Sequence, residues 1–191
     1  MQPFTLILAN TEAQFAAARE LFVEYSERLG VDLCFQGFTL ELAKLPSMYG
    51  APSGTLILAS TADGYIGCVG IRALDAGDVG DCEMKRLYVR EAARGSGLGR
   101  RLVQQALSAA RQMGYRRVLL DTLPQMAAAR GLYASLGFRQ IAAYYDNPIE
   151  GTTYMALSLQ GAPLPPDKSA TCRQVEAMET VVRVVPPLGA Q

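Results

Sequence analysis

Three alternate glycines, at positions 95, 97 and 99, lie between a strand-like and an amphipathic segment in the stretch VREAARGSGLGRRLVQQAL (residues 89–107). Glycine adopts positive φ at little steric cost, and a loop without side chains leaves its amides accessible to another molecule. The amphipathic segment is predicted to be a helix, whose first amides lack partners within the helix and carry partial positive charge. Together these features predict an anion site, for which phosphate is the usual occupant.

The composition excludes several classes of protein. A chain of 191 residues is expected to form one domain with a substantial core. Eighteen basic residues balance eighteen acidic ones, so no charge excess favours nucleic acid or a membrane surface as partner. The first residues, MQPFTLILAN, do not resemble a signal peptide, and no apolar run approaches the ~18–20 residues that span a bilayer. We expect a cytoplasmic protein.

The chain contains no histidine, which removes the commonest general base and the Ser–His and Cys–His nucleophile pairs. Its four cysteines are scattered and form no CxxC pair, so no metal site is expected, and free buried thiols are favoured over disulfides. Catalysis must therefore depend on carboxylates, tyrosine, lysine, backbone amides or a cofactor.

Hydrophobic periodicity and turn residues predict a mixed α/β (α+β) domain with about seven strands flanked by helices. Thr11 and Gly30 delimit the first helix, Pro46 is expected to end the second, and Pro124 to open the last. The predicted strands are 4–9, 54–60, 65–74, 80–89, 116–123, 138–144 and 152–159; the predicted helices are 11–30, 39–45, 98–113 and 124–137.

The character of the sequence changes near residue 161, where a polar, proline-rich stretch follows the last predicted strand. We therefore assign 1–160 to the folded domain and 161–191 to a C-terminal appendage, expected to be partly disordered.

Two familiar phosphate-binding motifs do not fit the glycine loop. A dinucleotide-binding loop needs G-x-G-x-x-G directly after a strand within a βαβ unit, but position 100 is Arg, and no crossover helices separate the preceding strands. A nucleotide P-loop is excluded because no Lys-Ser/Thr pair follows the last glycine.

The loop R-G-S-G-L-G (94–99) instead resembles the Q/R-x-x-G-x-G/A signature of the GNAT superfamily of acetyl-coenzyme A-dependent N-acetyltransferases. The preceding strand CEMKRLYV has the family's spacing, and AARGLYASLGF (128–138) resembles its A-x-x-L-Y-x-x-x-G-F helix. The order of predicted elements agrees from residue 4 to about 159. Met126 departs from the pattern, since the family often has Asn there, which puts in doubt a side-chain hydrogen bond to cofactor or substrate.

The resemblance implies a sheet that splays between its fourth and fifth strands, with acetyl-CoA as co-substrate. The pantetheine arm would lie along Leu87, Tyr88 and Val89, with an amide of this segment polarising the acetyl carbonyl. The pyrophosphate would lie on the amides of Arg94, Gly95, Ser96, Gly97, Leu98, Gly99 and Arg100. Arg94 is favoured as a side-chain ligand, whereas Arg100 either binds phosphate or lies on a solvated helix face.

The resemblance also implies two catalytic residues. Glu83 matches the family's strand glutamate and would serve as general base, directly or through water, although it could equally pair with Lys85 or Arg86. Tyr133 matches the tyrosine that protonates the leaving thiolate, the alternative being a packed core aromatic. Cys82 is not expected to act as nucleophile, since nothing nearby activates it.

The acceptor amine is expected near loop 32–38 and the segment AYYDNPIE, where the family determines specificity. Arg28 or Arg86 would hold a carboxylate, which favours an amino acid or related small acid. Asp121 and Thr122 either face the cleft or cap the next helix. The predicted walls are Tyr25, Arg28, Gln36, Arg86, Tyr144 and Tyr145.

Three functions remain open at this level. The first is acetylation of a small-molecule primary amine, which the tyrosine-rich segment favours because it suggests a closed pocket. The second is acetylation of a protein N-terminus or lysine, which needs an open groove. The third is a coenzyme A-binding sensor without catalysis, which Glu83 and Tyr133 disfavour. A homodimer is left open.

Overall fold

The computed structural model describes residues 3–74 and 80–160, so the predicted C-terminal appendage lies outside the described residues. Within them, one seven-stranded sheet has the order β1-β2-β3-β4-β5-β7-β6. All neighbouring strands pair antiparallel except β4 and β5, which are parallel. The strands are β1 Thr5–Leu8, β2 Thr55–Thr61, β3 Gly64–Ala73, β4 Asp81–Val89, β5 Arg117–Thr122, β6 Arg139–Ile141 and β7 Thr153–Ser158. The predicted mixed sheet is confirmed.

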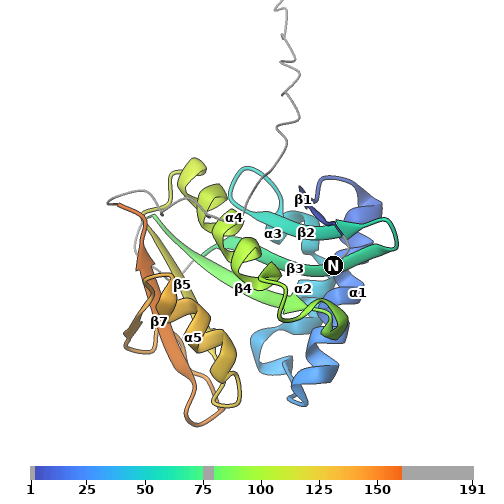
Figure 1. Cartoon of the computed structure of the whole chain (residues 1–191). Helices are drawn as coiled ribbons and strands as arrows, with labels where there is room; N and C mark the ends of the chain where they lie inside the picture. The colour runs from blue at the N-terminus through green and yellow to red at the C-terminus, as the bar shows by residue number, and fades with distance from the viewer. Residues whose placement is uncertain (1–2, 75–79, 161–191) are drawn as a thin grey trace, which may run out of the picture. The chain divides into compact units, whose positions relative to one another are not determined.

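Helices cover both faces of this sheet. Figure 1 shows α4 and α5 on the near face and α1, α2 and α3 behind the sheet. The helices are α1 Glu12–Leu29, α2 Phe38–Ala43, α3 Leu45–Tyr49, α4 Leu98–Gln112 and α5 Ala127–Ser135, with short 3-10 turns at Cys34–Gln36 and Glu91–Ala93. The buried face of α4 carries apolar residues at helical spacing, including Leu98, Leu102 and Ala106.

The ends of α1 follow directly from the sequence. The Thr11 hydroxyl accepts a hydrogen bond from the Gln14 amide, and the Gln14 side chain accepts one from the Thr11 amide, which forms a complete capping box. Gly30 ends the helix in the left-handed region at φ 65°, where glycine is favoured. The predicted limits of this helix are therefore confirmed.

Two proline predictions were wrong in position. Pro46 does not end a helix but lies in the first turn of α3, after α2 has ended at Ala43. Proline is tolerated there because the first-turn amides have no intrahelical acceptor. Pro124 likewise precedes its helix by three residues, because a turn stabilised by the Met126 amide and Leu123 carbonyl comes first.

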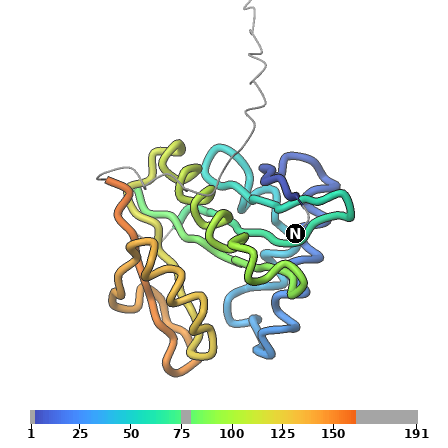
Figure 2. The backbone as a smooth tube through the Cα atoms, in the orientation of Figure 1, coloured from blue at the N-terminus to red at the C-terminus, as the bar shows by residue number. Residues whose placement is uncertain are grey.

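The parallel strands β4 and β5 separate part-way along their length. Their register includes Asp81 with Arg117 and ends at Glu83 with Leu119, although β4 continues to Val89. The divergence is visible in Figure 2, where the green and yellow strands start together and then part. The splay that the family resemblance implied is therefore present, and the β5-facing edge of β4 beyond Glu83 has no strand partner among the described residues.

Candidate active site

A β-bulge in β4 marks the point where the strands separate. Cys68 of β3 pairs with Tyr88 and Gly70 pairs with Lys85, so that Val69 faces the two residues Arg86 and Leu87. Arg86 has φ 57°, and it is the one described residue other than glycine with positive φ. Such strain is maintained only where the surroundings fix it, and here it falls within the bulge, next to Leu87.

The glycine loop has the geometry of an anion cradle. Gly95 and Gly97 have φ of 75° and 80°, and a Cβ at either position would meet no atom within 4 Å. Among the described residues, the amides of Gly95, Ser96 and Gly97 have no hydrogen-bond acceptor. The first turn of α4 follows immediately and adds amides without intrahelical partners. Open space and unpaired donors at this loop fit a pyrophosphate group.

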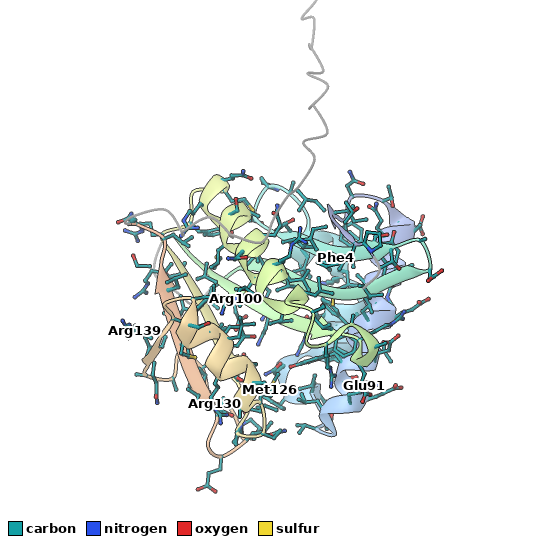
Figure 3. All side chains as sticks on the ribbon, in the orientation of Figure 1. Phe4, Glu91, Arg100, Met126, Arg130 and Arg139 are labelled. Carbon is teal, nitrogen blue, oxygen red and sulfur yellow. The ribbon has the colours of Figure 1, made fainter. Side chains whose placement is uncertain are left out.

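The two arginines of this loop are held differently. The Arg94 side chain donates from Nε to the Val89 carbonyl at 3.1 Å, which keeps its guanidinium beside the β4 end. Arg100 donates from Nη2 to the Ser135 hydroxyl at 2.7 Å and so bridges α4 to α5 (Figure 3). Arg94 is therefore the better placed of the two to add a charge-assisted bond to phosphate.

A channel of about 360 Å³ runs from this loop along the free edge of β4. Its walls come from β4, α1 and α5, the last including Met126, which Figure 3 labels at the start of that helix. The lining residues are Tyr25, Arg28, Leu29, Leu87, Tyr88, Val89, Arg94, Gly99, Met126, Ala128, Ala129 and Leu132. The predicted pantetheine segment, residues 87–89, therefore lines one continuous hollow with Arg94 and Gly99.

A second, much smaller hollow of about 30 Å³ shares Tyr25, Leu29, Leu87 and Met126 with the channel. It is lined mainly by polar groups from the splayed strands and from the turn before α2. These polar residues are Gln36, Lys85, Arg86, Asp121, Thr122 and Tyr133. We call this the polar pocket. The hydroxyl of Thr122 is buried there without a hydrogen-bond partner among the described residues.

Glu83 lies in a buried ion cluster next to this pocket but does not line it. Its Oε2 accepts from Arg72 Nε and Nη2 at 3.0 and 2.8 Å, and its Oε1 accepts from the Tyr144 hydroxyl at 2.7 Å. Lys85 Nζ lies 3.3 Å from Glu83 Oε1 and 2.8 Å from Asp121 Oδ1, so it links the two carboxylates. Both oxygens of Glu83 are therefore occupied.

Arg86 is held by a second buried cluster. Its Nη2 lies 2.5 Å from Glu41 Oε2, its Nε donates to Glu41 Oε1, and the Tyr49 hydroxyl also donates to Oε1. Burial alone would raise the pKa of Glu41, but the hydrogen bonds and charge of Arg86 outweigh it and keep that pKa below its usual value. Arg86 Nη1 donates to Gln36 Oε1 at 3.0 Å, which fixes the orientation of that amide.

Tyr133 lies on α5 and lines the polar pocket. The centroid of its ring lies 5.6 Å from the centroid of the Phe138 ring. Burial raises the pKa of its hydroxyl well above the usual value, and the nearby Tyr25 and Asp121 reinforce this shift. The hydroxyl therefore stays protonated at neutral pH. None of the hydrogen bonds among the described residues involves this hydroxyl, which leaves it available to a ligand.

The predicted substrate residues divide between the two hollows. Tyr25, Gln36 and Arg86 line the polar pocket, whereas Arg28 lines the channel and pairs with Glu91 at 2.9 Å on the surface. Tyr144 and Tyr145 pack edge-to-face against each other and against Tyr154. Their hydroxyls contact Glu83 and Gln36, which lie next to or in the polar pocket. Arg86 is fully engaged by Glu41 and Gln36, so it contributes positive charge without a freely projecting guanidinium.

Sequence reasoning named Lys85 only as a possible partner of Glu83, missed Glu41, and left Asp121 between two roles. A signal for Lys85 was present: Asp81, Glu83 and Lys85 alternate with Cys82 and Met84 along β4, which puts three charges on one face. Charges on a buried strand need partners, so this spacing indicates an ion cluster. Glu41 gave no comparable signal, because a lone glutamate on a short helix is usually solvated.

The cysteines and other chemical groups add no alternative site. Burial raises the pKa of Cys82 to about 12, so its thiol is not an available nucleophile. Cys68 is buried as expected, Cys34 is exposed, and Cys172 lies outside the described residues. Within residues 3–74 and 80–160, no three His, Cys, Asp or Glu side chains gather to hold a metal, and no helix has the length and hydropathy to cross a membrane.

Comparison with known proteins agrees with this geometry. The model of the acetyltransferase (GNAT) family matches residues 16–138. The chain belongs to the GNAT family. An N-acetyltransferase of Schizosaccharomyces pombe is 41% identical over 140 residues, covering 73% of this chain and 85% of the relative. The N-acetylaspartate synthetase of Danio rerio is 30% identical over 114 residues, which cover 59% of this chain and 40% of that protein.

A solved acetyltransferase structure from Salmonella typhimurium, with its cofactor acetyl-CoA, superimposes with a TM-score of 0.58 at 23% identity. It covers 85% of this chain and 98% of the other. The fold is therefore that of the GNAT acetyltransferases, and the protein is an acetyl-CoA-dependent N-acetyltransferase.

The buried carboxylates predict how the stability of this acetyltransferase depends on pH. Burial would raise the pKa of Asp121, but Lys85 outweighs it and holds that pKa below the usual value, as Arg86 does for Glu41. Because the unfolded chain then binds more protons in acid, these groups stabilise the fold above about pH 4, and the stabilisation is lost below it.

We therefore expect Tm to fall steeply below about pH 4 and to stay level between about pH 5 and 8, where no histidine titrates. Calorimetric scans from pH 8 to pH 3 measure this directly. A Tm that stays level down to pH 3 would show that these ion pairs contribute no net stability.

Proposed function

We propose that this N-acetyltransferase acetylates the primary amine of a small molecule, which attacks the acetyl-CoA thioester directly while both substrates are bound. The observation that carries the proposal is the polar pocket, which opens from the apolar channel at Leu87, where the β4 bulge lies. A thioester carried along the channel would meet an amine at this junction. Direct attack requires only this proximity and correct orientation.

The residues of the loop and of β4 are proposed to hold acetyl-CoA. The amides of residues 94–100 would bind the pyrophosphate, with Arg94 adding a charge-assisted bond. The edge of β4 at Leu87, Tyr88 and Val89 would hold the pantetheine arm, because its β5-facing side has no strand partner there. An amide turned toward the acetyl oxygen by the bulge would stabilise the negative charge that develops on it.

Two observations favour a small acceptor over a protein. The polar pocket has room only for a small polar group, since Gln36 closes it by bonding both Asp121 and Tyr145. The similarity to N-acetylaspartate synthetase, which is named for an acetylated amino acid, also supports a small acceptor.

The test is a turnover assay that uses the full chain with acetyl-CoA and measures released thiol. The acceptor panel contains L-amino acids including aspartate, aliphatic diamines, and peptides with a free N-terminus or an internal lysine. We expect turnover with one or more amino acids and little with the peptides. Turnover with peptides alone would assign protein acetylation. Binding of coenzyme A without turnover of any amine would favour a sensor.

A further inference from the structure

Two carboxylates lie near the proposed reaction centre, and their surroundings differ. Glu83 has its side chain only 2% exposed, lies within the paired part of β4 and β5, and has both oxygens bonded by Arg72, Tyr144 and Lys85. An amine that approached Glu83 would have to displace Arg72 from Oε2, or Tyr144 and Lys85 from Oε1. Hydrogen bonds between charged groups are among the stronger side-chain contacts, so such displacement is unfavourable.

Asp121 lies two residues beyond Leu119, the last β5 residue that pairs with β4, so β4 and β5 have already separated there, and it lines the polar pocket. Its Oδ1 accepts from Lys85 Nζ at 2.8 Å. Its Oδ2 accepts the Gln36 amide at the long distance of 3.3 Å, and the nearby Tyr145 hydroxyl helps to lower the pKa of the same carboxylate. One oxygen of Asp121 is thus fixed by Lys85, and the other makes only the long contact with Gln36 and lies near the Tyr145 hydroxyl.

The Gln36 amide shows what this oxygen can bind. Its Nε2 lies 3.3 Å from Asp121 Oδ2 and 3.1 Å from the Tyr145 hydroxyl, so two oxygens converge on one nitrogen donor. Gln36 comes from the turn before α2, and within the described part of the chain only Arg86 bonds its side-chain oxygen. A primary amine presents the same N–H donors and would fit the same two oxygens once the amide of Gln36 moves aside.

We propose that Asp121 and Tyr145 form the amine-binding site, that Asp121 accepts the proton from the acceptor nitrogen, and that Glu83 is a positioning residue. This assignment rests on the proposed function. Glu83 acts through Lys85 and Tyr144, since its two bonds keep Lys85 against Asp121 and keep the tyrosine pair in place.

The proton balance closes without a further reactant. The neutral amine nitrogen bonds to the acetyl carbon and the carbon–sulfur bond breaks, so nitrogen must lose one proton and sulfur must gain one. Asp121 Oδ2 takes the proton from nitrogen, and the Tyr133 hydroxyl, which lines the same pocket, donates one to sulfur. Proton exchange with solvent returns both side chains to their starting states.

The test compares Asp121→Asn with Glu83→Gln in the full chain, using acetyl-CoA and the amine of the panel that turns over fastest. We expect Asp121→Asn to lower kcat/KM for the amine about 100-fold or more, with KM for acetyl-CoA unchanged. Glu83→Gln should lower Tm and reduce turnover less than about 10-fold. Asp81→Asn is the matched control: it removes a buried carboxylate that pairs with Arg117, outside the pocket, so it should leave turnover unchanged.

Tyr145→Phe tests the same site if Asp121→Asn does not fold. Loss of one hydrogen bond worth about 1 kcal/mol should raise KM for the amine about fivefold and leave KM for acetyl-CoA unchanged. Wild-type turnover in Asp121→Asn, or an unchanged amine KM in Tyr145→Phe, would overturn the assignment. So would a larger loss of turnover in Glu83→Gln than in Asp121→Asn. If the wild-type protein acetylates none of the amines, the proposed function itself fails, and this assignment fails with it.

Discussion

Gly97→Glu is expected to weaken coenzyme A binding at least about 100-fold while leaving a folded protein. A Cβ at position 97 would meet no atom within 4 Å. The glutamate side chain would therefore extend into the open space in which the pyrophosphate is proposed to bind. Its carboxylate would repel the phosphates, and like charges in close contact cost several kcal/mol. Each 1.4 kcal/mol of binding free energy changes affinity tenfold, so only part of this repulsion is needed to weaken binding 100-fold.

The φ of 80° at Gly97 adds a cost that must be separated from the effect on binding. Gly114→Glu provides the matched control, since Gly114 has φ 84° and equally open surroundings but lies at the far end of α4. Both variants should lose about 1–3 kcal/mol of stability from backbone strain. Only Gly97→Glu should lose affinity in calorimetric titration with coenzyme A. Equal affinities for the two variants would show that the phosphates bind elsewhere.

Much of the fold could be predicted because local signals agreed with the final packing. Thr11 and Gly30 predicted the two ends of α1, because each ends the helix through hydrogen bonds to residues close in sequence. The alternate glycines of the loop predicted the start of α4, because Gly97 can adopt the positive φ found there. The Pro46 and Pro124 predictions were wrong because proline restricts only its near neighbours. It specifies a first turn or a boundary, and tertiary packing decides which.

The candidate site was less predictable, because its chemistry depends on partners distant in sequence. Lys85 and Asp121 are 36 residues apart, and Arg86 and Glu41 are 45 apart. No local pattern specifies which cation neutralises which carboxylate, and this pairing determines whether Glu83 or Asp121 has an oxygen available to a substrate. Family resemblance suggested Glu83 from its strand position, whereas its occupied oxygens became visible only in three dimensions.

Tyr133→Phe is expected to reduce kcat about 100-fold or more, because it removes the hydroxyl proposed to protonate the leaving thiolate. The ring of Tyr133 packs against Phe138, and phenylalanine would preserve that contact. None of the hydrogen bonds among the described residues involves this hydroxyl, so its removal leaves no partner unsatisfied there. Stability and coenzyme A affinity should therefore stay close to wild type, and the loss should appear in kcat.

Tyr115→Phe is the matched control for this change. Its hydroxyl donates to the Ser53 carbonyl at 2.6 Å, outside both hollows, so its loss should affect stability slightly and turnover not at all. Single-turnover measurements make the chemical step visible even when product release is slow. If Tyr133→Phe retains the wild-type rate in that measurement, the tyrosine serves packing alone. The proton would then reach sulfur from water, which the channel beside Leu87 can admit.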